Sequence, residues 1–345
     1  MAPPVRLALL GCGTLGEILA ERVYPRVRDV AQVAAVVDLR PERAEALRRL
    51  LHAPAFTSLE DAVAEVELDA VDVRLPHHLH LEGARRAAEL GLPFLIEKPM
   101  APRLDDAREI AALASQVGGP CGVSENYGYL APVVAARDLL RAGAIGDLLA
   151  VQSTRVFELG PEWRRDGWRL GGGGASGVLI DQAPHVARLL RTVVGELAEV
   201  LAYAAIGTQP EDSAAVACRF ESGVVGTQLY CWACPSPAAP EGIPELSVFG
   251  SGGSISAYVS YEGAGGGALL QRPGHPDEWH GTGTNYYDSL AGCLHDWAEC
   301  LVSGGDLGCS IAEGLADTAV LDAIRRSAAT GAAVTIDREV TPRAG

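Results

Sequence analysis

From residue 5 to residue 123, short apolar runs alternate with longer stretches in which apolar residues recur every three or four positions. The apolar runs predict strands over residues 5–10, 33–38, 70–75, 93–97 and 121–124. The periodic stretches predict helices over residues 14–28, 41–51, 79–90 and 104–117. Strands separated by helices of this length are typical of βαβ units, so the pattern predicts a doubly wound parallel α/β domain over residues 1–123.

Beyond residue 123 the alternation of strand and helix gives way to consecutive strands. Helices are expected over residues 130–142, 178–193, 286–303 and 310–329, and strands over residues 148–158, 198–206, 213–220, 223–231, 245–250 and 253–260. Strands that follow one another across turn residues are typical of an antiparallel or mixed sheet. We therefore expect a second α/β domain over residues 124–345, in which the Pro- and Gly-rich region 234–285 is the least interpretable.

Composition narrows the class of protein. The 345 residues are 48% hydrophobic, and no apolar run reaches membrane-spanning length without charges or glycine, so a cytoplasmic protein is expected. A net charge of −16 argues against nucleic acid and anionic membranes as partners. The eight cysteines are scattered over predicted strands and helices, which favours reduced core residues. No second Cys or His pair follows Cys231 and Cys234 at zinc-site spacing, so no metal is expected.

A glycine motif joins the first predicted strand to the first helix. Gly11 permits a tight turn, Gly13 lets the backbone approach a pyrophosphate, and Gly16 allows close helix packing. Asp38 ends the second strand and would bind the ribose hydroxyls of NAD, although Arg40 leaves NADP open. The alternative is a tight turn that holds no ligand. The residues expected to bind the cofactor here are Gly11, Cys12, Gly13, Thr14, Leu15, Gly16, Asp38, Leu39 and Arg40.

Two further loops follow predicted strands and reach the carboxyl edge of the same sheet, where open α/β folds bind ligands. We expect them to complete the cofactor site with Leu75, Pro76, His77, His80, Glu97 and Lys98. For the histidines the alternatives are contacts at a helix start and exposure to solvent. Lys98 is the only lysine among 28 basic residues, which suggests a need for a compact ammonium that can exchange a proton.

Asp181 and His185 lie four residues apart near the start of a predicted helix, so their side chains share one face. Such a pair can hold a substrate hydroxyl and move its proton, but it is also a common arrangement of a helix cap and a core histidine. The glycine run 171–174 precedes the pair and permits a close approach to another backbone or to a cofactor. Basic and aromatic side chains flank this run and form either a pocket wall for an anionic group or a solvated loop: Arg155, Trp163, Arg164, Arg165, Trp168 and Arg169.

Taken together, these motifs resemble the glucose–fructose oxidoreductase, inositol dehydrogenase and MocA family of nicotinamide-dependent oxidoreductases. The resemblance rests on GCGTLG, LPHHLHLEGARRAAELGLPFLIEKPMA, ENYGYLAPVVAARDLLRAGAIGDLLAV, GGGGASGVLIDQAPHVARLL and AEGLADTAVLDAIRRSAATGAAVTI. It implies a Rossmann domain followed by an α/β domain whose open, largely antiparallel mixed sheet often forms oligomer contacts. A homodimer or homotetramer is therefore expected.

The resemblance also implies roles for single residues. Lys98 of the Glu-Lys-Pro motif, Asp181 and His185 correspond to the family's catalytic group. The substrate-binding residues we expect are Lys98, Tyr127, Arg155, Trp163, Arg164, Trp168, Asp181 and His185. Two departures point to an altered substrate pocket: Gln182-Ala183-Pro184 stands where relatives often carry x-Gly-x, and Gly128 stands where arginine often follows the Asn-Tyr motif.

These observations favour an NAD(P)-dependent dehydrogenase or reductase that transfers a hydride to or from a secondary alcohol or ketone. The substrate class is a sugar, cyclitol or related polyol, with nucleotide-sugars and secondary-metabolite intermediates included. Two alternatives remain open. One is a redox-neutral hydrolase, lyase or epimerase that oxidises its substrate transiently, and the other is a non-catalytic regulator that senses NAD or a sugar.

Overall fold

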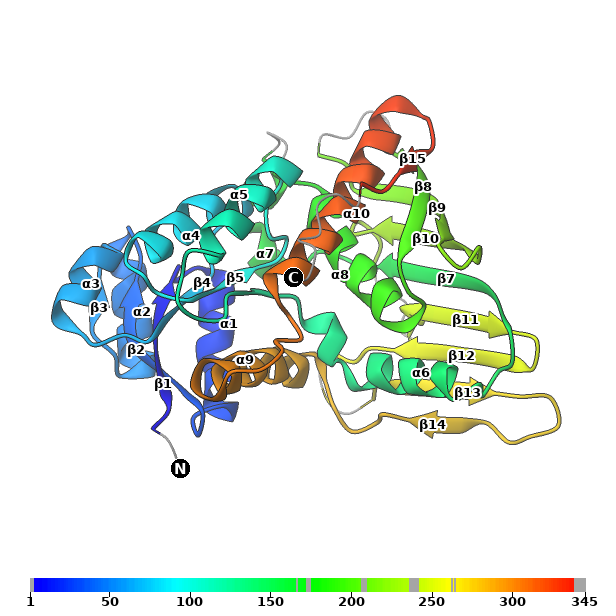
Figure 1. Ribbon diagram of the computed structural model, residues 1–345, viewed down its shortest axis with the longest axis horizontal. Helices are drawn as coiled ribbons and strands as arrows, with labels where there is room; N and C mark the ends of the chain where they lie inside the picture. The colour runs from blue at the N-terminus through cyan, green and yellow to red at the C-terminus, as the bar shows by residue number, and fades with distance from the viewer. Residues whose placement is uncertain are drawn as a thin grey trace. The chain divides into compact units, whose positions relative to one another are not determined.

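The computed structural model describes residues 3–165, 167–171, 175–205, 210–235, 242–261, 263 and 265–337. They form two compact units (Figure 1). The first contains the chain up to Glu125 together with Leu290–Thr318, and the second contains Asn126–Ser289 and the segment that starts at Ala319. Gly172, Gly173 and Gly174 of the expected glycine run lie outside the described residues.

The first unit is built on a six-stranded parallel sheet, as predicted. Its strand order is β3-β2-β1-β4-β5-β6. The strands are β1 Val5–Leu10, β2 Ala31–Val37, β3 Ala55–Phe56, β4 Ala70–Val73, β5 Phe94–Glu97 and β6 Gly122–Ser124. The order reverses between β1 and β4, so the loops that follow these two strands flank the crevice where doubly wound folds bind ligands.

The helices of this unit are α1 Thr14–Arg22, α2 Pro41–Leu51, α3 Leu59–Glu65, α4 His80–Glu89 and α5 Leu104–Ala114, and short 3-10 turns form η1 Tyr24–Arg26 and η2 His77–Leu79. The expected helix over residues 14–28 is too long. It ends at Arg22 because Pro25, within η1, has no N–H to continue an α-helix. The sequence interpretation also missed β3 and α3, which are too short to give a clear period.

The C-terminal stretch Leu290–Thr318 groups with the first unit, whereas the sequence interpretation places everything after residue 123 in the second domain. Long-range contacts explain the difference. The indole Nε1 of Trp297 donates to the carbonyl of Pro120 at 2.8 Å, and the amide of Val123 donates to the carbonyl of Cys309 at 2.8 Å. Trp297 and Cys309 are fully buried, so this stretch completes the core beside β6.

The second unit is built on a nine-stranded mixed sheet of order β14-β13-β12-β11-β7-β10-β9-β8-β15. Its strands are β7 Leu148–Val156, β8 Leu197–Ala204, β9 Ser213–Phe220, β10 Val225–Cys231, β11 Leu246–Gly250, β12 Gly253–Tyr258, β13 Gly267–Gln271, β14 Glu278–His280 and β15 Val334–Thr335. Only the β7–β10 pair is parallel. The predicted fold class, a parallel Rossmann sheet plus a largely antiparallel mixed sheet, is therefore confirmed, although β13, β14 and β15 were not foreseen.

The second unit's helical elements are η3 Asn126–Tyr129, α6 Ala131–Arg141, α7 Pro161–Arg164, η4 Trp168–Leu170 and α8 Val178–Val193, while α9 Tyr286–Ser303 and α10 Ile311–Thr330 contribute residues to both units. Helices α6 and α8 pack on each other and on the sheet. The sheet alternates accordingly: on β9, Val216 and Phe220 are buried, whereas on the other face Tyr203, Val225 and Leu229 are exposed.

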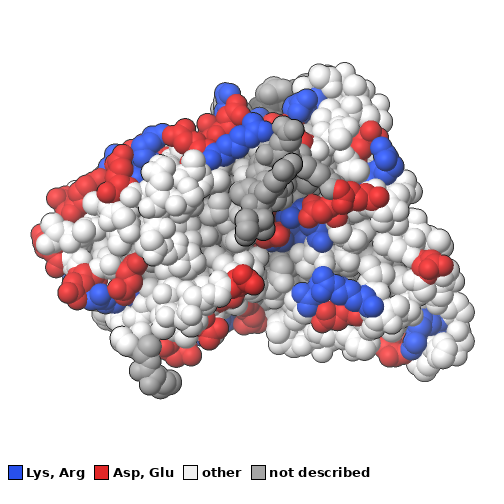
Figure 2. Space-filling view, viewed as in Figure 1, with Lys and Arg blue, Asp and Glu red and all other residues white. Residues whose placement is uncertain are grey.

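Charge is distributed in local pairs over the first unit. Figure 2 shows acidic and basic side chains interspersed along the surface of α4 and α5. Arg85 bridges Glu82 and Glu109, and Arg86 bridges Glu60 and Glu82. None of the helices in the described part of the chain is long and apolar enough to cross a membrane.

Candidate cofactor site and active site

The glycine motif forms the turn that the sequence predicts. Gly11 lies at φ +107°, and a Cβ there would come within 2.5 Å of the carbonyl oxygen of Arg74. A Cβ on Gly16 would lie 2.7 Å from the carbonyl oxygen of Gly11. Both positions therefore require glycine, and the loops after β1 and β4 are packed against each other. Helix α1 begins at Thr14, so its N-terminal amides face this turn.

Asp38 follows β2 directly and closes the same turn. Its Oδ2 accepts a hydrogen bond from the amide of Cys12 at 2.8 Å, and its Oδ1 accepts one from the amide of Arg40 at 2.9 Å. Leu39 is 85% exposed beside it. A carboxylate oxygen has two lone pairs, so Asp38 can accept further bonds from a ribose. The glycine cradle, the open helix end and this carboxylate fit the pyrophosphate and ribose of NAD.

His80 ties together the two other loops of the predicted cofactor site. Its Nδ1 lies 2.8 Å from the carbonyl of Pro99, and its Nε2 lies 2.9 Å from the carbonyl of Leu75. Burial lowers the pKa of His80 to about 4, so the ring is neutral near pH 7. The two expected loops do converge, with His80 bonded to backbone between them. His77 is buried in η2, with its ring 5.6 Å from that of His80.

A buried ionic cluster anchors the Glu97-Lys98 segment. Arg74 Nε lies 2.7 Å from Asp72 Oδ1, and Arg74 also pairs with Glu97. The hydroxyl of Tyr24 donates to Asp72 Oδ2 at 2.6 Å. Burial raises the pKa of Glu97, against the opposite effect of the Arg74 charge. Because these contacts hold Glu97, they also restrict the backbone of the next residue, Lys98.

In the second unit, α8 carries Asp181 and His185, as predicted. The imidazole of His185 stacks on the ring of Tyr127, with centroids 4.4 Å apart and planes 24° apart. The Oδ1 of Asp181 lies 3.5 Å from the Nε of Arg169. Arg169 itself lies over the rings of Trp163 and Trp168, at 4.7 and 4.1 Å. The structure thus brings together two catalytic candidates and three of the expected pocket residues.

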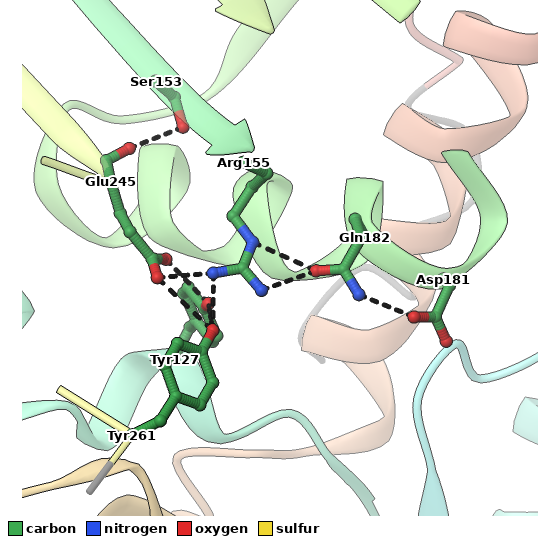
Figure 3. A network of polar contacts seen from close by, with 7 residues as sticks. All are labelled: Tyr127, Ser153, Arg155, Asp181, Gln182, Glu245 and Tyr261. Carbon is green, nitrogen blue, oxygen red and sulfur yellow. Dashed lines mark hydrogen bonds and ion pairs between the residues drawn. The ribbon is translucent and has the colours of Figure 1, made fainter. Parts of the chain in front are cut away.

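The arginines of this region are already engaged by the protein. Arg155 pairs with Glu245, and its Nε and terminal nitrogen donate to Gln182 Oε1 at 3.0 and 2.7 Å (Figure 3). Arg164 Nε donates to the carbonyl of Leu159 at 2.8 Å. Arg155 and Arg169 are thus paired with protein carboxylates, which does not favour an anionic substrate tail at these two residues, whereas Arg164 is exposed.

Sequence reasoning missed Glu245 and Tyr261 of this network, and it noted Gln182 only as part of a departure from the family pattern. Tyr127 donates to Glu245 Oε2 at 2.7 Å, and Arg155 donates to the hydroxyl of Tyr261 at 2.6 Å. Arg155 is one of the buried residues in the alternating pattern of β7, and a buried arginine requires a carboxylate partner. That signal predicts an acidic partner without identifying it.

No group of three or more His, Cys, Asp or Glu side chains that could hold a metal ion is present within the described ranges. All eight cysteines are free thiols, and six of them are buried, as expected of core residues. Cys231 and Cys234 are only partly exposed, and the Sγ of Cys234 lies 3.6 Å from the carbonyl of Pro235.

Comparison with known proteins identifies the family. Residues 5–125 match the model of the oxidoreductase family with an NAD-binding Rossmann fold, and residues 133–256 match that of the GFO/IDH/MocA C-terminal domain. The chain therefore belongs to the GFO/IDH/MocA oxidoreductase family, as the resemblance predicted. The cofactor of its Rossmann domain is NAD, which confirms that expectation at the level of the family.

Among curated relatives, 1,5-anhydro-D-fructose reductase of Ensifer adhaerens is 34% identical over 180 residues, 50% of this chain and 53% of that protein. The match thus spans about half the length of that relative. D-apiose dehydrogenase of Rhizobium rhizogenes is 25% identical over 95% of this chain and 96% of its own.

Solved structures show the same fold. An oxidoreductase from Agrobacterium radiobacter, in complex with NAD+, L-tartaric acid and magnesium, superimposes with a TM-score of 0.84 at 21% identity, covering 96% of this chain and 98% of its own. Levoglucosan dehydrogenase in complex with NADH and levoglucosan gives a TM-score of 0.79 at 21% identity, with 97% and 100% covered.

Proposed function

We propose that this protein is an NAD-dependent dehydrogenase or reductase that acts on a secondary alcohol or ketone of a sugar, cyclitol or related polyol. The observation that carries the proposal is the Asp181–His185 pair on one face of α8, with His185 stacked on Tyr127, in a chain whose other unit is an NAD-binding domain. A histidine held against an aromatic ring, one helical turn from a carboxylate, suits proton exchange with a hydroxyl group.

Each catalytic candidate has a distinct task in the direction of oxidation. His185 takes the proton of the substrate hydroxyl, Lys98 stabilises the negative charge that develops on that oxygen, and Asp181 accepts a hydrogen bond from a neighbouring hydroxyl or orients His185. NAD, which the glycine turn and Asp38 would hold, would supply the acceptor for the hydride that leaves the carbinol carbon. Reduction runs through the same groups in reverse.

Within the polyols, we favour a neutral substrate. Arg155, Arg164 and Arg169 are each engaged by a carboxylate, an amide or a carbonyl of the protein. The indoles of Trp163 and Trp168 offer apolar faces of the kind that pack on the C–H face of a sugar ring. Three of the similar proteins act, by their names, on the uncharged compounds anhydrofructose, apiose and levoglucosan, whereas a fourth was crystallised with L-tartaric acid.

The test follows nicotinamide absorbance in the presence of NAD, with neutral sugars, cyclitols and their keto forms beside phosphorylated and carboxylated sugars. Lys98→Ala should lower kcat by about 10²- to 10⁴-fold and leave NAD affinity nearly unchanged. Arg85→Ala, which removes a partly exposed arginine of α4, is the matched control and should turn over normally. Near-normal turnover by Lys98→Ala would refute the assignment, and a preference for charged sugars would refute the neutral substrate.

The open face of the nine-stranded sheet supports a second proposal, that two copies of the chain pair through it. Tyr203, Val225, Leu229 and Phe249 are exposed there, and Val225 and Phe249 line a hollow of about 660 Å³. Exposed apolar side chains gathered on one sheet face suit an isologous dimer. Light scattering should give twice the chain mass for the wild type and the single mass for Leu229→Lys. A wild-type monomer, or no effect of Leu229→Lys, would contradict this pairing.

A further inference from the structure

A continuous chain of polar contacts runs across the second unit to the carboxylate of Asp181 (Figure 3). It starts at Glu245, just before β11, passes through Arg155 of β7 and reaches Gln182 of α8. Gln182 Nε2 then donates to Asp181 Oδ2 at 2.6 Å. Arg155, Glu245 and Gln182 are all buried, so bulk water does not compete with these contacts.

The direction of every hydrogen bond in this chain is fixed by chemistry. Arginine can only donate, so the carbonyl oxygen of Gln182 must face the two nitrogens of Arg155. The amide nitrogen of Gln182 is thereby turned toward Asp181, and because that nitrogen only donates, Asp181 Oδ2 must accept. A proton on Oδ2 would face the N–H of Gln182. Through Gln182, the permanent charge of Arg155 therefore favours the deprotonated form of Asp181.

Arg169, Glu245, Tyr261 and Glu211 are further charged or titratable groups whose contacts are described around this network. Arg169 of η4 lies 3.5 Å from Asp181 Oδ1 and favours its anion. Glu245 is neutralised by Arg155 and hydrogen-bonded to Tyr127, and Tyr261 accepts from Arg155. At the start of α8, the carboxylate of Glu211 accepts from the amide of Leu179 at 3.1 Å. Of the two catalytic candidates on α8, His185 is held by Tyr127.

From these contacts we propose that Gln182 is a positioning residue, which holds Asp181 as an ionised carboxylate of fixed orientation and makes it an acceptor toward the substrate. The inference rests on the proposed function and deepens it. An Asp181 that only accepts requires a donor on the substrate, so the enzyme selects substrates with a hydroxyl next to the reacting carbon. Substrates with a carbonyl or a carboxylate at that position are disfavoured, because their oxygen and the carboxylate of Asp181 are both hydrogen-bond acceptors.

Two substitutions of Gln182 separate positioning from packing. Gln182→Met keeps the volume and removes the donor, so kcat should fall by about 10- to 100-fold at every pH, with NAD affinity unchanged. Gln182→Glu places a second carboxylate against Asp181, and repulsion between two carboxylates this close strongly raises the pKa of one of them. Its activity relative to the wild type should recover by about 10-fold or more between about pH 9 and about pH 6, as the introduced carboxyl group takes up a proton and donates again.

Gln228→Met is the matched control. Gln228 is a buried glutamine of β10 in the same unit, where it accepts from the hydroxyl of Tyr230, and no contact joins it to Asp181 in the described structure. Its relative activity should not vary with pH. If Gln182→Glu and Gln182→Met instead show the same pH-independent loss, and that loss follows their thermal midpoints, Gln182 is only a packing residue and the inference is overturned.

A second measurement is independent of turnover. Apparent thermal midpoints of the wild type, Gln182→Glu, Asp181→Asn and the double variant are compared at the same two pH values. The deficit of Gln182→Glu should shrink at low pH, and Asp181→Asn should abolish that pH dependence because the opposing charge is gone. If the effects of Gln182→Glu and Asp181→Asn on the thermal midpoint simply add, the inference is overturned even where hydride transfer is established. If the two effects are coupled in a protein that oxidises no polyol, the positioning of Asp181 stands and the proposed function is refuted.

Discussion

Replacing Arg74 with methionine should destabilise the first unit strongly. Arg74 holds two buried carboxylates, Asp72 at 2.7 Å and Glu97, and the exposed fractions of the three side chains are 2%, 0% and 10%. Removing one partner of a buried ion pair typically costs about 3–5 kcal/mol, because the remaining charge is left without compensation. For a unit of this size the loss corresponds to a fall of roughly 6–20 °C in the thermal midpoint.

Circular dichroism during heating measures this midpoint, and pH checks the cause. Burial already raises the pKa of Glu97, and loss of Arg74 should raise it further. A carboxyl whose folded pKa is raised stabilises the fold at low pH and loses that contribution as pH rises through the folded pKa. The deficit of Arg74→Met should therefore be largest at neutral pH and shrink on acidification, and adding Glu97→Gln should restore part of the stability.

Arg85→Met provides the control, since Arg85 forms two ion pairs on the exposed face of α4. Exposed pairs contribute about 0–1 kcal/mol, so its midpoint should barely move. If Arg74→Met also costs less than about 1 kcal/mol, or if its deficit does not depend on pH, then the buried cluster does not support the Glu97-Lys98 segment as described.

Three further predictions concern the cofactor side of the protein. Gly11→Ala should abolish NAD binding in fluorescence titrations, because its Cβ would lie 2.5 Å from a backbone oxygen; Gly91→Ala, also at positive φ but with nothing within 4 Å, should bind normally. A histidine whose folded pKa is about 4 lowers the free energy of unfolding as pH falls from about 6.5 toward 4, by up to about 3 kcal/mol. His80→Asn should therefore remove this acid sensitivity from acid unfolding curves. Substitution of the exposed His78 by Asn should leave it in place. Asp38→Ala should lower the preference for NAD over NADP by about 10-fold or more in steady-state kinetics, and an unchanged ratio would contradict a ribose contact.

What the sequence predicts well is local. The glycine turn, Asp38 at the end of β2 and the Asp181–His185 spacing on α8 each depend on residues close together in the chain, so periodicity and motif spacing place them correctly. Even there, the end of α1 was misplaced because one proline outweighs an otherwise continuous helical pattern.

What the sequence could not predict depends on partners that are distant in the chain. Glu245 lies 90 residues from Arg155 and 118 from Tyr127, and nothing local marks it among 44 acidic residues. The segment Leu290–Thr318 joins the first unit through contacts such as Trp297 to Pro120, 177 residues apart. Arg155 illustrates the consequence: as a sequence feature it suggested an anion site, whereas Glu245 and Gln182 occupy its guanidinium.

The cytoplasmic location and the oligomeric state stay predictions, and so does the joint action of Lys98 with Asp181 and His185. Lys98 belongs to the first unit and the other two residues to the second. The family supplies the expectation that they act on one substrate.

The most direct test of the central claim uses a polyol that the enzyme accepts, deuterated at the carbinol carbon, with mass spectrometry of the nicotinamide after turnover. A dehydrogenase should release NADH that carries the deuterium, with net accumulation of ketone and a slower rate than for the protiated substrate. Loss of the signal in His185→Asn and Lys98→Ala would tie it to the proposed residues. If the deuterium never appears on the nicotinamide, or returns to a product of unchanged oxidation state, the protein is not a net dehydrogenase and the account is contradicted.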